Sequence, residues 1–177
     1  MLEAVATLLA ALHLIGAALG VGGVTYAELA HAKAIADGRV ERKEYEYFAR
    51  AFWALRWGMT TVLLSGLALV YVQFFLPNSP DTLVYSPLWI QNTLALAITL
   101  GAWFMSRRSW PWWLGSSVVF AGWWMMFILD LFALFTVSYL LLVFTYVVAI
   151  FLSAGFWGYV QTLLHERASM RHKHQHS

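Results

Sequence analysis

Four ionisable side chains interrupt the long apolar stretches of this sequence: His13, Glu28, Arg56 and Asp130. An ionisable group inside a membrane span raises the free energy of insertion by roughly 2.5–3.5 kcal/mol. We therefore expect each of these residues either to have an interaction partner or to have a functional role. A histidine or a carboxylate in such a place can bind a cofactor, relay a proton or hold two helices together. The chemistry of this chain is therefore sought first at these four positions.

His13 shares one helical face with Gly16, Gly20, Gly23 and Ala27. Small residues along a face let another helix or a flat ligand approach the backbone, which predicts that His13 points into a helix bundle. One reading is a buried neutral histidine that is hydrogen-bonded across helices to Asp130, Thr145 or Tyr146. The other is an axial ligand or a proton-relay group.

Asp130 is compatible with either interpretation of His13, because a carboxyl group inside a membrane span must be paired, protonated or hydrated. Met126 lies one turn from Asp130 on the same face, so a His13/Met126 pair of haem ligands is geometrically feasible. Simple core packing is the alternative for Met126.

Glu28 and Arg56 are expected at comparable depth on the first two helices. An ion pair between them would fix the register of these helices. The alternative is that Arg56 binds an anion or a haem propionate, because its planar fork suits carboxylates.

Three further sets of histidines lie at or beyond the boundary of the apolar stretches. His31 returns to the face of His13 after five helical turns, and His165 is predicted at the same boundary with Glu166 beside it. His31 and His165 could jointly hold a metal or haem iron, or they are solvated interfacial residues. The polar tail of residues 166–177 carries alternating histidines, which indicates either a weak metal chelator or a solvated, frayed end.

The amino-acid composition indicates a protein that lies in a lipid bilayer. Of the 177 residues, 61% are apolar and 11% are charged, and the mean hydropathy is +0.66. A water-soluble domain carries about 25% charged residues, so the lipid bilayer must be the solvent. The chain has no cysteine, which excludes disulfides, thiolate metal sites and cysteine nucleophiles.

The sequence predicts an all-α polytopic membrane bundle, because a span needs roughly 20 predominantly apolar residues. Five segments qualify, at about 5–29, 51–76, 87–106, 112–135 and 138–163, in a single bundle formed by residues 1–165. A charged helical hairpin at about 30–50, turning at Gly38, is expected to project beyond the membrane.

The positions of the charges predict the orientation. Alternating spans place the N-terminus, the loop at 77–86 and the turn at 136–138 on one face, which carries Glu3 and Asp81 but neither Lys nor Arg. Ten of the eleven basic residues fall on the other face. Positively charged loops stay cytoplasmic, so we expect the N-terminus outside, the C-terminus inside, and a bacterial inner-membrane location. These basic residues give no indication of nucleic-acid binding.

The run Leu12-His13-Leu14-Ile15-Gly16, followed by Gly22-Gly23, resembles the opening of small bacterial membrane proteins of the CopD-type and HemJ-type superfamily. Ser65-Gly66-Leu67 in the second helix and Trp89 shortly after a proline extend the resemblance over residues 10–105. This resemblance implies a haem-binding or copper-linked redox role, and His13 is the first residue that would match a functional residue of the family. His31 matches a second histidine of HemJ-type proteins.

The chain departs from HemJ-type proteins just after Trp89, where they carry a basic residue and this sequence has Gln91-Asn92. The resemblance therefore does not extend to protoporphyrinogen oxidation.

Three functional hypotheses follow. The first is a redox protein that binds haem b or a metal through His13. In this hypothesis His31 and His165 form a second site near the cytoplasmic side, and Arg56 binds a haem propionate. The second is an accessory or assembly subunit of a larger membrane complex, or a homo-oligomer. The third is a small proton-coupled carrier that uses His13, Asp130 and the Glu28–Arg56 pair as a relay.

Overall fold

The computed structural model describes residues 2–37, 42–75, 86–132 and 138–175. It confirms an all-helical fold and contains five helices in these ranges: α1 (Leu2–Asp37), α2 (Arg42–Phe75), α3 (Ser86–Ser106), α4 (Trp112–Phe132) and α5 (Tyr139–Gln175). The turn predicted at Gly38, the loop predicted at 77–86 up to residue 85, and most of the turn predicted at 136–138 lie outside the described residues. The backbone of the polar tail continues α5 as far as Gln175.

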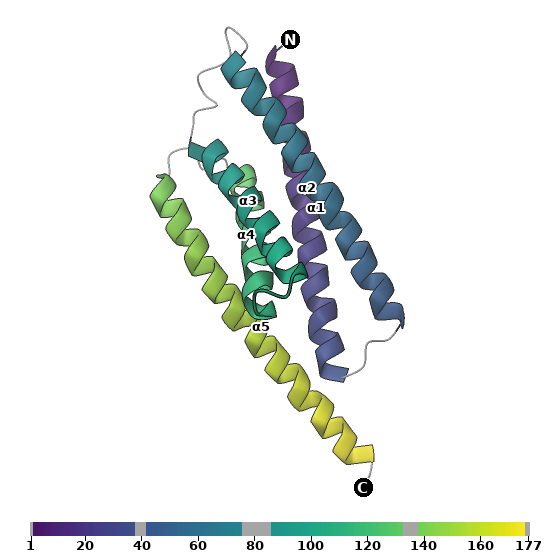
Figure 1. The fold of residues 1–177 in the computed structure, drawn as a ribbon. Coiled ribbons are helices and arrows are strands. Elements are labelled where there is room, and N and C mark those ends of the chain that lie inside the picture. Colours follow the sequence, from purple (N-terminus) through teal and green to yellow (C-terminus); the bar gives the residue numbers. More distant parts are fainter. Residues whose placement is uncertain (1, 38–41, 76–85, 133–137, 176–177) are drawn as a thin grey trace.

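The helices run alternately up and down the bundle, so the two termini lie at opposite ends (Figure 1). The α1 and α2 helices form a long antiparallel pair, and α3, α4 and α5 form a second group in which α4 and α5 pack against α1 and α3 contacts α2 (Figure 1). Because α3 and α4 have only 21 residues each, α1 and α5 extend past them at the end opposite the N-terminus.

Four helices contain a segment long and apolar enough to cross a membrane in the part of the chain that the structure describes. These segments are Glu3–Ala34, Ala49–Val72, Trp112–Phe132 and Tyr139–Glu166. The remaining helix, α3, has polar residues Gln91, Asn92 and Thr93 in succession near its start and is not among them.

The small residues of α1 are used for close helix packing. A Cβ atom on Gly16 would lie 3.0 Å from the Gly58 carbonyl oxygen, and one on Gly58 would lie 2.9 Å from the Gly16 carbonyl oxygen. The α1 and α2 backbones therefore touch at this crossing, as small residues permit in membrane helices. Gly20 has a different role: a Cβ atom there would lie 2.0 Å from the indole of Trp123, so the ring of this α4 residue occupies the notch.

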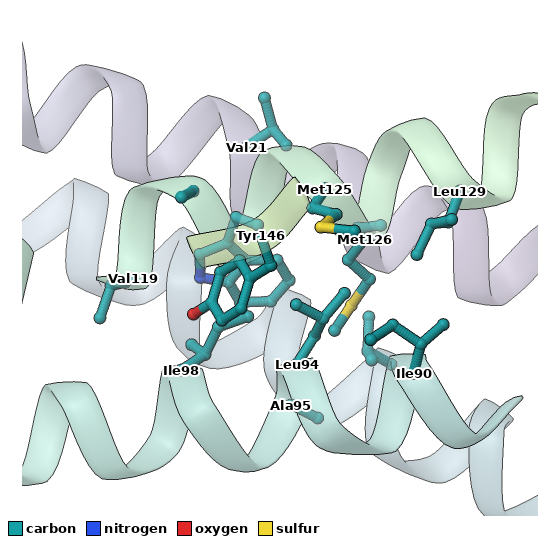
Figure 2. Packing of buried hydrophobic residues seen from close by; sticks show 14 of the residues in the cluster. Val21, Ile90, Leu94, Ala95, Ile98, Val119, Met125, Met126, Leu129 and Tyr146 are labelled. Carbon is teal, nitrogen blue, oxygen red and sulfur yellow. The ribbon is translucent and has the colours of Figure 1, made fainter. Parts of the chain in front are cut away.

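The apolar core lies around α4. Trp123 and Met126 are 1% and 0% exposed, and Ile90 and Leu94 of α3 are fully buried against them. Figure 2 shows these α3 side chains and Ile98 facing the methionines of α4, with the Tyr146 ring of α5 beside them. Most of α5 presents large apolar side chains outward, which suits a helix surrounded by lipid.

A Schellman motif at the end of α3 sets the tight reversal into α4. The Ser109 amide donates to the Phe104 carbonyl at 3.1 Å, and the Arg108 amide donates to the Met105 carbonyl at 3.0 Å. Arg108 adopts the left-handed conformation (φ 54°) that glycine usually supplies at this position. The α4 helix then starts on the Pro111 carbonyl, which accepts from the Leu114 and Gly115 amides. This reversal returns α4 alongside α3 and places Trp123 against Gly20.

We expect Gly20→Ala to lower the free energy of unfolding by about 1–3 kcal/mol, because the added methyl group overlaps a fully buried indole. Gly22→Ala is the matched control: nothing lies within 4 Å of its Cβ position, so it should be neutral or slightly stabilising. Thermal unfolding of the detergent-purified variants measures both. Equal unfolding temperatures for the two variants would contradict the packing described here.

Candidate functional site

His13 is anchored to α2 through one ring nitrogen. The imidazole is 5% exposed, and its Nδ1 lies 3.0 Å from the Ser65 hydroxyl. That hydroxyl donates to the Thr61 carbonyl at 2.6 Å, so it accepts from a protonated Nδ1. The Val62 carbonyl also accepts a hydrogen bond from the ring, and Gly66 leaves room for the ring edge. These contacts favour the tautomer with the proton on Nδ1 and turn Nε2 away from α2.

The second nitrogen faces a carboxyl group of α4. His13 Nε2 lies 3.9 Å from Asp130 Oδ2, and neither of these buried atoms has a hydrogen-bond partner among the described residues. The other oxygen, Oδ1, accepts a hydrogen bond from the Gln91 side-chain amide of α3. We call His13, Ser65, Gln91 and Asp130 the His13 cluster; it joins one residue from each of α1, α2, α3 and α4.

The geometry of the His13 cluster suits proton binding. With Nδ1 protonated, Nε2 offers a lone pair to a proton, and the Asp130 carboxylate offers the nearest negative charge at 3.9 Å. With one proton between them, the pair is either a neutral imidazole beside a protonated carboxyl or an imidazolium beside a carboxylate, and both forms have a net charge of zero. Adding or removing one proton changes the net charge of the pair in apolar surroundings, where that charge has a strong electrostatic effect.

Glu28 and Arg56, the expected ion pair, have separate environments. Glu28 is 5% exposed and hydrogen-bonds Ser116 of α4, whereas Arg56 is exposed on α2. Among the described residues, the structure records no ion pair between them. The structure thus connects Glu28 to α4 instead of α2.

The other predicted ligands are dispersed. Met126 lies in the apolar core, His31 packs on Trp112 with ring centroids 4.6 Å apart, and His165 is exposed on α5. In the described ranges, no three His, Asp or Glu side chains come close enough to hold a metal ion. The alternative partners proposed for His13 are engaged elsewhere: Tyr146 donates to the Val118 carbonyl and Thr145 to the Leu141 carbonyl.

Haem b fits this arrangement poorly. Both ring nitrogens of His13 face protein groups, and the notch at Gly20 that could admit a flat ligand holds the Trp123 ring. Iron ligation would require His13 to turn away from Asp130.

The sequence identified His13 and Asp130 but not their polar neighbours Ser65 and Gln91, nor Ser116 as the partner of Glu28. Gln91 carried a usable signal, since an amide within the first turns of an apolar helix needs a partner. Ser65 and Ser116 carried none, because a serine in a membrane helix can satisfy its hydroxyl on its own backbone.

Comparison with known proteins yields no family model, no curated protein and no solved structure that matches this chain.

Replacing Gln91 by leucine removes the donor to Asp130 and leaves a buried carboxyl oxygen unpaired. We expect this change to cost about 1–3 kcal/mol of unfolding free energy. Asn92→Leu, at the neighbouring exposed position, is the control and should be neutral or slightly stabilising. Unfolding in detergent compares the two variants; a Gln91→Leu protein as stable as Asn92→Leu would show that the hydrogen bond contributes nothing.

Proposed function

We propose that this chain is a five-span protein of the bacterial inner membrane, with its N-terminus outside and its C-terminus in the cytoplasm. The antiparallel course of the five helices and the separation of the termini support this topology (Figure 1). The basic residues gather at the end where α1 and α5 extend past α3 and α4, as the positive-inside rule requires of a cytoplasmic face. In this arrangement the His13 cluster lies in the outer half of the membrane.

Single introduced cysteines test this topology. The chain has no native cysteine, so a maleimide can label only the introduced residue. Ser138→Cys, just before α5, should react with a membrane-impermeant maleimide on cells whose outer membrane has been permeabilised. Ser109→Cys, in the reversal between α3 and α4, should react only after lysis. Both positions are exposed at opposite ends of the bundle. The reverse labelling pattern would overturn the orientation.

The function that the geometry supports best is proton-coupled: the His13 cluster takes up and releases a proton within the membrane, as part of a small proton-coupled carrier. The observation that carries this proposal is the approach of His13 Nε2 to Asp130 Oδ2 at 3.9 Å, with neither atom hydrogen-bonded to any residue that the structure describes. Ionisable groups that face the interior of a membrane bundle commonly belong to proton or substrate pathways. Ser65 and Gln91 keep the two groups in register.

Infrared titration of the protein in liposomes tests this proposal. Asp130→Asn should remove the signal of one protonatable carboxyl and reduce the uptake measured with a pH-sensitive dye by about one proton per molecule. Glu3→Gln, which changes an exposed carboxyl near the same end of α1, should leave the signal of the buried carboxyl intact. Unchanged titration in Asp130→Asn would refute the assignment.

The visible spectrum of the same preparation tests the haem hypothesis directly. On the proton proposal, protein expressed with an adequate haem supply has no Soret band. A Soret band that disappears in His13→Ala would make His13 a haem ligand and overturn the proton proposal.

A further inference from the structure

Glu28 is a second buried ionisable group on the face of α1 that carries His13. The two residues are 15 positions apart, which corresponds to about 22 Å along the helix and a rotation of about 60°. Glu28 is as inaccessible as His13, at 5% exposed, and its hydrogen bond comes from Ser116 near the start of α4. Glu28 therefore lies near the opposite end of α4 from Asp130.

The surroundings of Glu28 are polar but contain no recorded counter-charge. Thr25, one turn earlier on α1, has a buried hydroxyl for which the described part of the chain provides no hydrogen-bond partner. His31, one turn later, is partly buried against Trp112, and Arg56 of α2 points to the exposed surface. Among the described residues, no basic side chain forms an ion pair with Glu28. A carboxyl without a counter-ion in an apolar bundle exists most readily in its protonated form.

The segment of α1 between His13 and Thr25 is apolar. Its inward positions are Ala17, Gly20, Val21 and Val24, which are all buried. Trp123 fills the notch at Gly20 and is 1% exposed. Gly20 is about 10 Å from His13 and about 12 Å from Glu28 along the helix. The largest side chain of the core thus lies midway between the two ionisable positions.

We propose that Glu28, with Ser116 and Thr25, forms a second proton-binding site on the cytoplasmic side of the bundle, and that Trp123 seated on Gly20 is the barrier separating it from the His13 cluster. This inference rests on the proposed function, since it gives the carrier one proton site facing each side of the membrane. The barrier keeps protons from passing between the sites while Trp123 stays in place. Movement of the indole would admit water between them.

The site and the barrier are tested separately. Infrared titration of the otherwise intact protein should show that Glu28→Gln removes a carboxyl signal different from the one removed by Asp130→Asn. If Glu28→Gln changes nothing while Asp130→Asn removes its signal, the second site is overturned and the proposed function stands. If Asp130→Asn alone changes nothing, the proposed function fails instead.

For the barrier, proteoliposomes containing a pH-sensitive dye are given a pH gradient and the rate of its decay is measured. Trp123→Ala should accelerate the decay several-fold over the wild-type chain. Trp124→Ala is the matched control, because its neighbouring indole is 37% exposed and does not fill the Gly20 notch. Adding Glu28→Gln to Trp123→Ala should return the rate toward that of the wild type.

Trp123→Leu serves as a second, milder variant, and size-exclusion chromatography shows that each protein is folded before reconstitution. A decay rate in the Trp123 variants equal to that in Trp124→Ala would overturn the barrier. A leak in Trp123→Ala that persists unchanged with Glu28→Gln would remove Glu28 from the proton path.

Discussion

A polar group inside a bilayer has no water to satisfy it, and the rest of this structure depends on how the bundle meets that constraint. His13 satisfies one nitrogen on α2 and turns the other toward α4, while Asp130 takes its hydrogen bond from α3. The pairing therefore ties four helices together at a single level. Each of these hydrogen bonds spares a buried polar atom a cost of several kcal/mol in apolar surroundings, whereas His13 Nε2 and Asp130 Oδ2 have none among the described residues.

Close backbone approach makes this pairing possible. The contact between Gly16 and Gly58 brings α1 and α2 near enough for His13 to reach Ser65 across a short gap. On the neighbouring side of α1, Gly20 admits Trp123 and so fixes the rotation of α4. Asp130 lies seven residues after Trp123, two helical turns further along α4, and its depth relative to His13 follows from that contact.

Buried apolar side chains separate the two buried ionisable positions His13 and Glu28. A continuous polar path would conduct protons at all times, whereas an uninterrupted apolar core would hold no proton at all. The arrangement along α1, with His13 and Glu28 at its two levels and Trp123 between them, has the features that controlled proton exchange requires. The exposed apolar surface of α5 suits contact with lipid.

The all-helical fold and the candidate residues His13, Glu28 and Asp130 could be predicted from the sequence. These follow from hydropathy and helical periodicity, which are local properties of the chain. The sequence predicted five membrane spans, four of which meet the length and hydropathy of a span in the described residues. It also predicted that Glu28 pairs with Arg56, on the assumption that opposite charges at similar depth must meet.

The tertiary structure alone decided the partners. Whether Glu28 meets Arg56 of α2 or Ser116 of α4 depends on helix rotation, which packing at Gly16, Gly20 and Gly58 sets and hydropathy does not encode. The same rotation places Met126 in the apolar core and leaves His165 on the outer surface of α5. Ser65 and Gln91 became recognisable as site residues only once four helices had converged, since each is ordinary in its own helix and distinctive only beside His13 and Asp130.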